Sequence, residues 1–261
     1  MSAIVSNVGR IGFAATAFLL LAPTISRADE GGVSFWLPGQ YASLAAAPQV
    51  PGWAMGVVYL HSNVSASGNV AASREITTGR IPPTVNVNLN LSLSGQADLV
   101  VLSPTYTFAT PVLGGQLSIG VASWFGRSSA SIAGTLTATA GPVVATRSGV
   151  LADSLTSYGD VVPTATLRWN QGVNNYMVYV TGDIPAGDYS PLRLANLGIG
   201  HGTIDAGGAY TYLNPATGNE FSATAGFTYN FENPDTQYRN GIDLHFDWGA
   251  AHFLSKQFSS A

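Results

Sequence analysis

The ten residues from Val85 to Ser94 read VNVNLNLSLS, with an apolar residue at every odd position and Asn or Ser at every even one. Strict alternation is the period of a β-strand, because successive side chains point to opposite faces. This strand is therefore apolar on one face and polar but uncharged on the other. A soluble sandwich or a membrane barrel could use such a strand, and about ten residues let a tilted strand cross the hydrocarbon.

The charge content of the whole chain favours the barrel. Charged residues are 9% of the 261 residues, whereas soluble domains carry about 25%. Lys256 is the only lysine. A barrel needs little surface charge because lipid covers much of its outside. The absence of cysteine excludes disulfides, thiol nucleophiles and thiolate metal sites.

The first 28 residues are typical of a secretory signal peptide. Arg10 supplies the positive start, Ile11–Ala22 is an apolar core too short to span as a helix, and Ser26-Arg27-Ala28 offers a cleavage site. An uncleaved inner-membrane anchor is the alternative. Cleavage leaves 8 basic and 14 acidic residues, a net charge of −6. Such a charge argues against nucleic acid as a partner.

The rest of the chain predicts an all-β fold, an antiparallel transmembrane β-barrel in residues 54–261. Residues 29–53 do not alternate and form either a lead-in or plug segment folded into the lumen or a loose N-terminus. The predicted strands are about 54–61, 84–94, 97–108, 116–125, 129–138, 157–170, 174–182, 202–213, 219–231 and 240–251.

The predicted links between these strands alternate in length. Short links fall at Gly95-Gln96, 126–128, Gln171–Val173 and Asn214–Gly218, and longer ones lie between them. Bacterial outer-membrane barrels alternate short periplasmic turns with longer external loops in this way. The first link, 62–83, is long, so the barrel is expected to begin on the periplasmic side.

Several segments of the C-terminal third resemble a known family. They are Asp183–Tyr189 (DIPAGDY), Leu194–Gly198 (LANLG), Gly207–Tyr212 (GGAYTY), Thr217–Ser222 (TGNEFS), Phe227–Gly241 (FTYNFENPDTQYRNG) and His245–Trp248 (HFDW). This region resembles the proteins named for the meta pathway of phenol degradation, which are regarded as outer-membrane channel-like proteins. The lead-in Glu30-Gly31-Gly32, followed by Pro38-Gly39, fits the same family.

The resemblance also implies at least one further hairpin after residue 251. We therefore expect about ten strands of about twelve, with a barrel that is incomplete because the chain is truncated at its C-terminus. The alternative is that ten strands close by themselves, which an even count permits.

The polar faces of the predicted strands supply the candidate site. We expect these side chains to line the lumen: Asn86, Asn88, Asn90, Ser92, Arg168, Glu220, Ser222, Thr224, Thr228, Asp243, His245 and Asp247. The apolar face of Val85–Ser94 is expected to meet lipid. Asp243, His245 and Asp247 could also serve as a general base or a metal site. A polar lumen wall explains them better, because ligands on one extended strand do not converge on a single ion.

The sequence thus predicts a channel of the bacterial outer membrane, exported with a cleaved signal peptide. Its expected partners are outer-membrane lipid, the barrel-assembly machinery and a small apolar or aromatic solute. We expect no enzymatic activity, cofactor or bound metal, and diffusion through an open pore, a lateral gap or past the N-terminal segment. The alternatives are a structural or adhesive surface β-protein without transport activity, and a soluble periplasmic sandwich.

Overall fold

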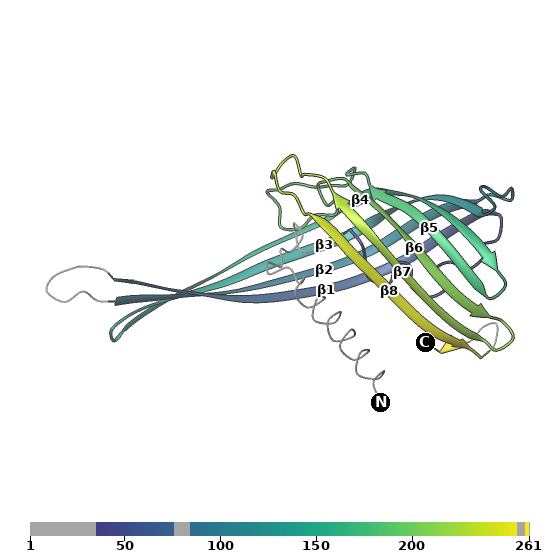
Figure 1. Cartoon of the computed structure of the whole chain (residues 1–261). Coiled ribbons are helices and arrows are strands. Elements are labelled where there is room, and N and C mark those ends of the chain that lie inside the picture. Colours follow the sequence, from purple (N-terminus) through teal and green to yellow (C-terminus); the bar gives the residue numbers. More distant parts are fainter. Residues whose placement is uncertain (1–34, 76–83, 255–258, 261) are drawn as a thin grey trace, which may run out of the picture. The chain divides into compact units, whose positions relative to one another are not determined.

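The strands of the protein form one antiparallel sheet in chain order (Figure 1). A computed structural model describes residues 35–75, 84–254 and 259–260, so the expected signal peptide (1–28) lies outside the described residues. The strands are β1 (Gly52–Glu75), β2 (Thr84–Thr107), β3 (Gln116–Ala140), β4 (Val143–Gln171), β5 (Asn174–Asp183), β6 (Thr203–Asn214), β7 (Asn219–Asn230), β8 (Ile242–Phe253) and β9 (Ser259–Ser260). Among the described residues no helix is long and apolar enough to cross a membrane. The all-β antiparallel class is confirmed.

The number of strands differs from the prediction because two predicted turns are absent. Gly95 and Gln96 lie inside β2, and residues 126–128 lie inside β3. A two-residue hairpin needs positive φ in its turn, and Gly95 has none. Most of the predicted loop 139–156 is likewise the first half of β4, after a turn that contains Gly141 at φ 57°.

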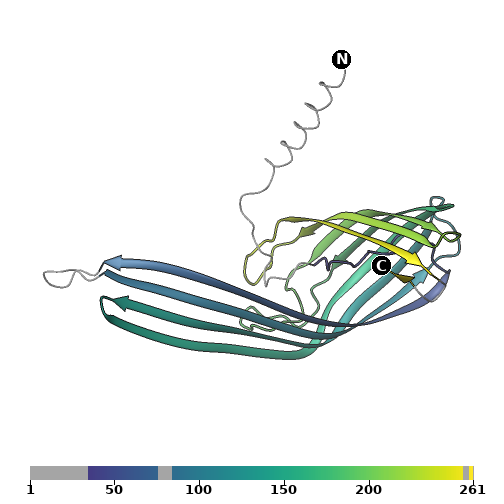
Figure 2. The ribbon, with the colours of Figure 1, turned by 90° about the horizontal axis from the view of Figure 1, so that it is seen from below.

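The sheet curls but does not close on itself among the described residues (Figure 2). β1 pairs with β2 only, and β8 pairs with β7 and the short β9. The alternative, in which ten strands close by themselves, is therefore not seen, and the described strands form a half-barrel with fewer strands than the ten predicted.

The links of the second half agree with the prediction. β4 and β5 join through a tight turn with Gly172 at φ 65°, and β6 and β7 through a turn that ends at Gly218 with φ 74°. Residues 184–202 and 231–241 are the long loops between the other strands. Since neighbouring strands are antiparallel, the short turns lie at one end of the sheet and these loops at the other.

Strands β1–β4 are much longer than β5–β8. They contain 24 to 29 residues, against 10 to 12 in β5–β8. At about 3.3 Å per residue, 24 residues span about 80 Å and 12 span about 40 Å. β4 pairs with β5 only over Thr164–Gln171, so the extra length lies at the loop end (Figure 1). We call residues 62–75, 84–97, 128–140 and 143–156 the extension.

Apolar side chains cover the convex face of the sheet, opposite to where residues 35–51 lie. Every strand from β1 to β8 contributes to this set of side chains, which we call the outer band. Its exposed members are Trp53, Met55, Val57, Tyr59, Val100, Leu102, Ile119, Val121, Phe125, Tyr158, Tyr176, Val178, Val180, Ile204, Phe221, Phe227, Tyr229, Ile242, Leu244, Phe246 and Trp248.

The apolar side chains of β2 lie on the concave face in the extension and on the convex face in the rest of the strand. Its register with β1 has no irregularity from Glu75 to Gly52, so all odd residues of β2 share one face. Leu89 and Leu91 therefore lie on the face of Thr107, which is buried on the concave side. Asn88 and the other even residues lie on the face of Leu102 in the outer band. The concave face is thus polar between β4 and β8 and apolar in the extension.

Candidate functional site

Buried polar side chains line the concave face of β4–β8. They alternate with the outer band, as the period of a strand requires. They include Arg168 on β4, Asp205 and Thr211 on β6, and Ser222 and Thr224 on β7. Burying so many polar groups is costly unless they are hydrogen-bonded, so their partners define what this face holds.

Residues 35–51 lie against this polar wall and supply many of those partners. We call them the inner segment. The amide of Leu44 donates to Glu220 Oε1 over 3.0 Å and to Ser222 Oγ over 3.1 Å. The amide of Ala46 donates to Thr211 Oγ1 over 3.0 Å. The inner segment has no regular secondary structure, so side chains of the wall satisfy backbone groups that a strand or helix would otherwise pair.

Two further hydrogen bonds run in the opposite direction, from side chains of the wall to carbonyl groups of the inner segment. Thr224 Oγ1 donates to the carbonyl of Tyr41 over 2.8 Å, and Arg168 Nε donates to the carbonyl of Ala45 over 3.4 Å. Ala46 is completely buried. The inner segment therefore fills the middle of the concave face, and the described structure contains no open channel there.

Trp36 anchors the start of the inner segment in a slot between aromatic rings. Its indole stacks on His245 with ring centroids 3.6 Å apart and planes 12° apart. Tyr41 and Tyr179 flank it at 5.8 and 5.7 Å. Its Nε1 donates to Asp247 Oδ2 over 3.0 Å. We call this arrangement of Tyr41, Tyr179, His245 and Asp247 the indole slot.

A polar chain lies behind the indole slot. His245 Nε2 lies 2.8 Å from Asp205 Oδ2 and 3.3 Å from the hydroxyl of Tyr179, and Thr228 Oγ1 also donates to Asp205 Oδ2. Asp205 is completely buried. Within the described residues, Asp205 Oδ1 and His245 Nδ1 have no hydrogen-bond partner. The polar chain behind the slot thus keeps one buried acceptor, Asp205 Oδ1, and the slot itself one ring nitrogen, His245 Nδ1, without a partner.

The structure brings together eight of the predicted residues. Asp243, His245 and Asp247 share the inner face of β8, as predicted, and their register partners on β7 are Thr228, Gly226 and Thr224. Their partners differ, since Asp243 accepts from Asn230 Nδ2 over 2.7 Å. No group of three potential metal ligands converges anywhere in the described part of the chain.

The four predicted residues of β2 are not part of this cluster. Asn86, Asn88, Asn90 and Ser92 lie in the extension. They project from the face of β2 that carries Leu102 and the outer band, as the uninterrupted register requires.

The sequence profile of one protein family matches residues 65–261, three quarters of the chain. The description of that family is the MetA-pathway of phenol degradation. The chain belongs to this family. No curated protein and no solved structure matches the chain.

The part of the chain matched by the phenol MetA-pathway family includes β2–β8 and so the whole polar wall. The inner segment precedes the match, although it fills the site. The family assignment therefore applies to the wall of the site, while the position of Trp36 is known from the structure alone.

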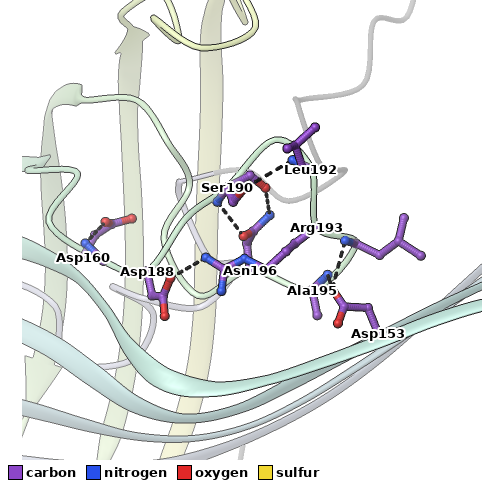
Figure 3. A network of polar contacts seen from close by, with 10 residues as sticks. Asp153, Asp160, Asp188, Ser190, Leu192, Arg193, Ala195 and Asn196 are labelled. Carbon is purple, nitrogen blue, oxygen red and sulfur yellow. Dashed lines mark hydrogen bonds and ion pairs between the residues drawn. The ribbon is translucent and has the colours of Figure 1, made fainter.

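Two family-like segments, Asp183–Tyr189 after its first residue and Leu194–Gly198, lie in the loop 184–202, which is hydrogen-bonded to β4 (Figure 3). The carboxylate of Asp160 accepts from the amides of Gly187 and Ile199, each over 2.7 Å. Asp153 Oδ2 accepts from the amides of Leu194 and Ala195, each over 3.2 Å. Two carboxylates of β4 thus hold the loop by its backbone.

The same loop has an internal ion pair between Asp188 and Arg193 (Figure 3). The hydrogen bond from Arg193, with a second from Ser157, lowers the pKa of Asp188 below its usual range. Trp124 of β3 adds a contact from the concave side, because its Nε1 donates to the carbonyl of Leu197 over 3.0 Å. The loop therefore packs over the loop end of the concave face.

Sequence reasoning missed four residues of the site. Trp36 and Tyr41 lie in a segment whose sequence does not alternate, so nothing in it predicted which strands these two rings contact. Tyr179 and Asp205 did carry a signal. Each lies on the polar side of its strand, between outward neighbours such as Val178 and Ile204.

Proposed function

We propose that this chain is an outer-membrane β-barrel protein that lets small apolar or aromatic molecules enter the cell. One observation carries the proposal. The outer band is apolar and exposed on all eight long strands, while the opposite face of β4–β8 is polar and buried. Lipid is the solvent that favours such an inverted sheet, because it leaves exposed apolar side chains without cost.

The lengths of β5–β8 agree with this placement. Ten to twelve residues are about what a tilted strand needs to cross the hydrocarbon. On β1 and β2 the outer band ends at a polar group, where Tyr59 donates to Asp98 over 2.7 Å beside His61. Tyrosines and charges are typical of the headgroup level. The outer band therefore has the height of a lipid-facing belt and, on β1 and β2, a polar border at one end.

The family and the contents of the concave face support the kind of solute. The family is described by a pathway of phenol degradation, and the inner segment places aromatic rings against the polar wall. Because the inner segment fills the concave face, the solute passes beside it or after it has moved. The open edge of β1, and that of β8 before its short pairing with β9, offer a lateral route in the described sheet.

Uptake by cells tests the proposal. Cells that produce the protein should carry it in the outer-membrane fraction and should take up labelled phenol at low concentration faster than cells without it. Glucose uptake serves as the control and should not change. Recovery of the protein in the soluble periplasmic fraction, or equal phenol uptake by both strains, would overturn the proposal.

The extension favours one alternative function. With short turns in the periplasm, the extension projects outward from the membrane, about 40 Å beyond the ends of β5–β8 at the usual rise per residue. A surface protein with a structural or adhesive role would use such a projection. Removing residues 62–97 and 128–156 should abolish adhesion under this alternative, and should leave phenol uptake unchanged under the leading proposal.

A further inference from the structure

We propose that the indole slot is a binding site for a flat aromatic solute that bears an N–H or O–H donor, and that this solute replaces the side chain of Trp36. The inference rests on the proposed function, since it assigns a site and a chemical class to the solute. Trp36 is then a resident ligand supplied by the protein itself.

The geometry of the slot suits a planar ring. The His245 ring lies parallel to the indole at stacking distance, and Tyr41 and Tyr179 meet it at tilted angles of 52° and 30°. Offset and tilted contacts of this kind are the arrangements that aromatic rings prefer. A non-planar ring of similar volume would lose the stacking contact with His245.

The polar groups of the slot select for a donor. Asp247 Oδ2 accepts from the indole Nε1, and a phenolic O–H in the same place would donate to the same oxygen. A ring without a donor would leave this carboxylate without its partner, which costs more than the bond itself contributes. Asp205 Oδ1 is a second buried acceptor without a partner among the described residues.

The two unused atoms indicate that the slot is not made for Trp36 alone. Asp205 is completely buried, and buried polar atoms are usually satisfied. An indole has a single donor, which Asp247 already accepts. A solute with two hydroxyl groups could satisfy both carboxylates, so a dihydroxylated ring should bind more tightly than phenol.

Replacement of the indole would loosen the start of the inner segment. Residues 35–40 are held to the wall chiefly by Trp36, whereas Tyr41 has its own contacts, with Thr224 and with Tyr179. The amides of Leu44 and Ala46 have their own acceptors on β6 and β7. Solute binding should therefore release residues 35–40, while Tyr41, a wall of the slot, and residues 44–46 stay in place.

The first experiment empties the slot by the substitution Trp36→Gly and measures binding of indole to the protein in detergent by calorimetry. Indole and phenol should bind this variant at least tenfold more tightly than they bind the matched control Trp53→Gly, which loses an exposed indole of the outer band but keeps Trp36 as a competitor in the slot. Toluene should bind about tenfold more weakly than phenol, the ratio that one hydrogen bond to a charged acceptor supplies. Absence of indole binding to folded Trp36→Gly protein would overturn the inference.

The second experiment uses the unaltered protein and so does not depend on the folding of a variant. Hydrogen exchange should become faster at residues 35–40 when phenol is added, and toluene should need about tenfold higher concentration for the same change. Unchanged exchange at saturating phenol contradicts the inference. Transport is measured separately. Binding without phenol uptake would contradict the proposed function but not the binding site. Phenol uptake without binding would contradict the binding site but not the proposed function.

Discussion

Trp36 Nε1 and Asp247 Oδ2 lie 3.0 Å apart, although 211 positions separate the two residues in the chain. This hydrogen bond joins the start of the inner segment to the last long strand of the sheet. It couples the contents of the concave face to the strand at its open edge.

The substitution Trp36→Phe tests the strength of this coupling. Phenylalanine keeps a stacked ring on His245 but leaves Asp247 without its donor. We expect a loss of about 1–2 kcal/mol in the free energy of unfolding, because a partly buried carboxylate loses its partner. Urea unfolding in detergent measures the loss. The matched substitution Trp53→Phe should cost less than half as much, and equal losses would contradict the assigned contact.

The outer band predicts where an arginine is tolerated. Val178→Arg places a charge near the middle of β5 and should destabilise the protein in lipid by about 2–4 kcal/mol. Val150→Arg makes the same change in the extension, which the proposed function places in water, and should change stability by about 0.5 kcal/mol or less. Unfolding titrations in liposomes compare the two variants. Similar costs would show that the outer band does not face lipid.

Asp160 should determine the order of the loop 184–202. Asp160→Ala removes the acceptor for the amides of Gly187 and Ile199, and we expect these amides to lose about 1–3 kcal/mol of protection. Hydrogen exchange measured residue by residue reports the change. Asp153→Ala, which removes two longer hydrogen bonds, is the comparison and should have a smaller effect. A loop that stays fully protected without Asp160 would be held by other contacts.

The ion pair of the loop predicts a response to acid. Since the pKa of Asp188 is lowered in the folded protein, mainly by Arg193, the contribution of the pair is complete at neutral pH. It is lost as the pH falls below about 4, the ordinary range of aspartate, and through the lowered value. Exchange in the loop should rise over that range, and Arg193→Gln should remove the rise. A rise centred near pH 6 would point to a different group.

Local pattern was sufficient to predict β5–β8. There the alternation of Ser222, Thr224 and Thr228 with apolar neighbours coincides with clear turns at Gly172 and Gly218. The residues of β7 and β8 that the pattern assigns to the polar face share the concave side of the sheet, because each face meets one environment over the whole strand length.

Local pattern was not sufficient for β2. The alternation around Leu89 predicted a strand correctly, yet the side of the sheet depends on the register with the other half of β2. Gly95 resembles a turn residue, and only its pairing with Val64 and Ala130 shows that the strand continues. Small uncharged residues are compatible with turns and strands alike, so composition left the choice open.

The indole slot lay beyond prediction for a different reason. Its members come from the inner segment, β5 and β8, and no periodicity relates them. Contacts between such distant positions follow from the curl of the sheet, which brings the wall around Trp36.

The most direct measurement of the central proposal is the rate of phenol entry into sealed vesicles. Their outer leaflet should be lipopolysaccharide, because phospholipid alone lets phenol pass. Vesicles that contain the folded protein should admit phenol faster than vesicles without it, with no change in the entry of glucose. Equal rates of phenol entry with and without the folded protein would contradict the proposal that this chain is a channel for aromatic solutes.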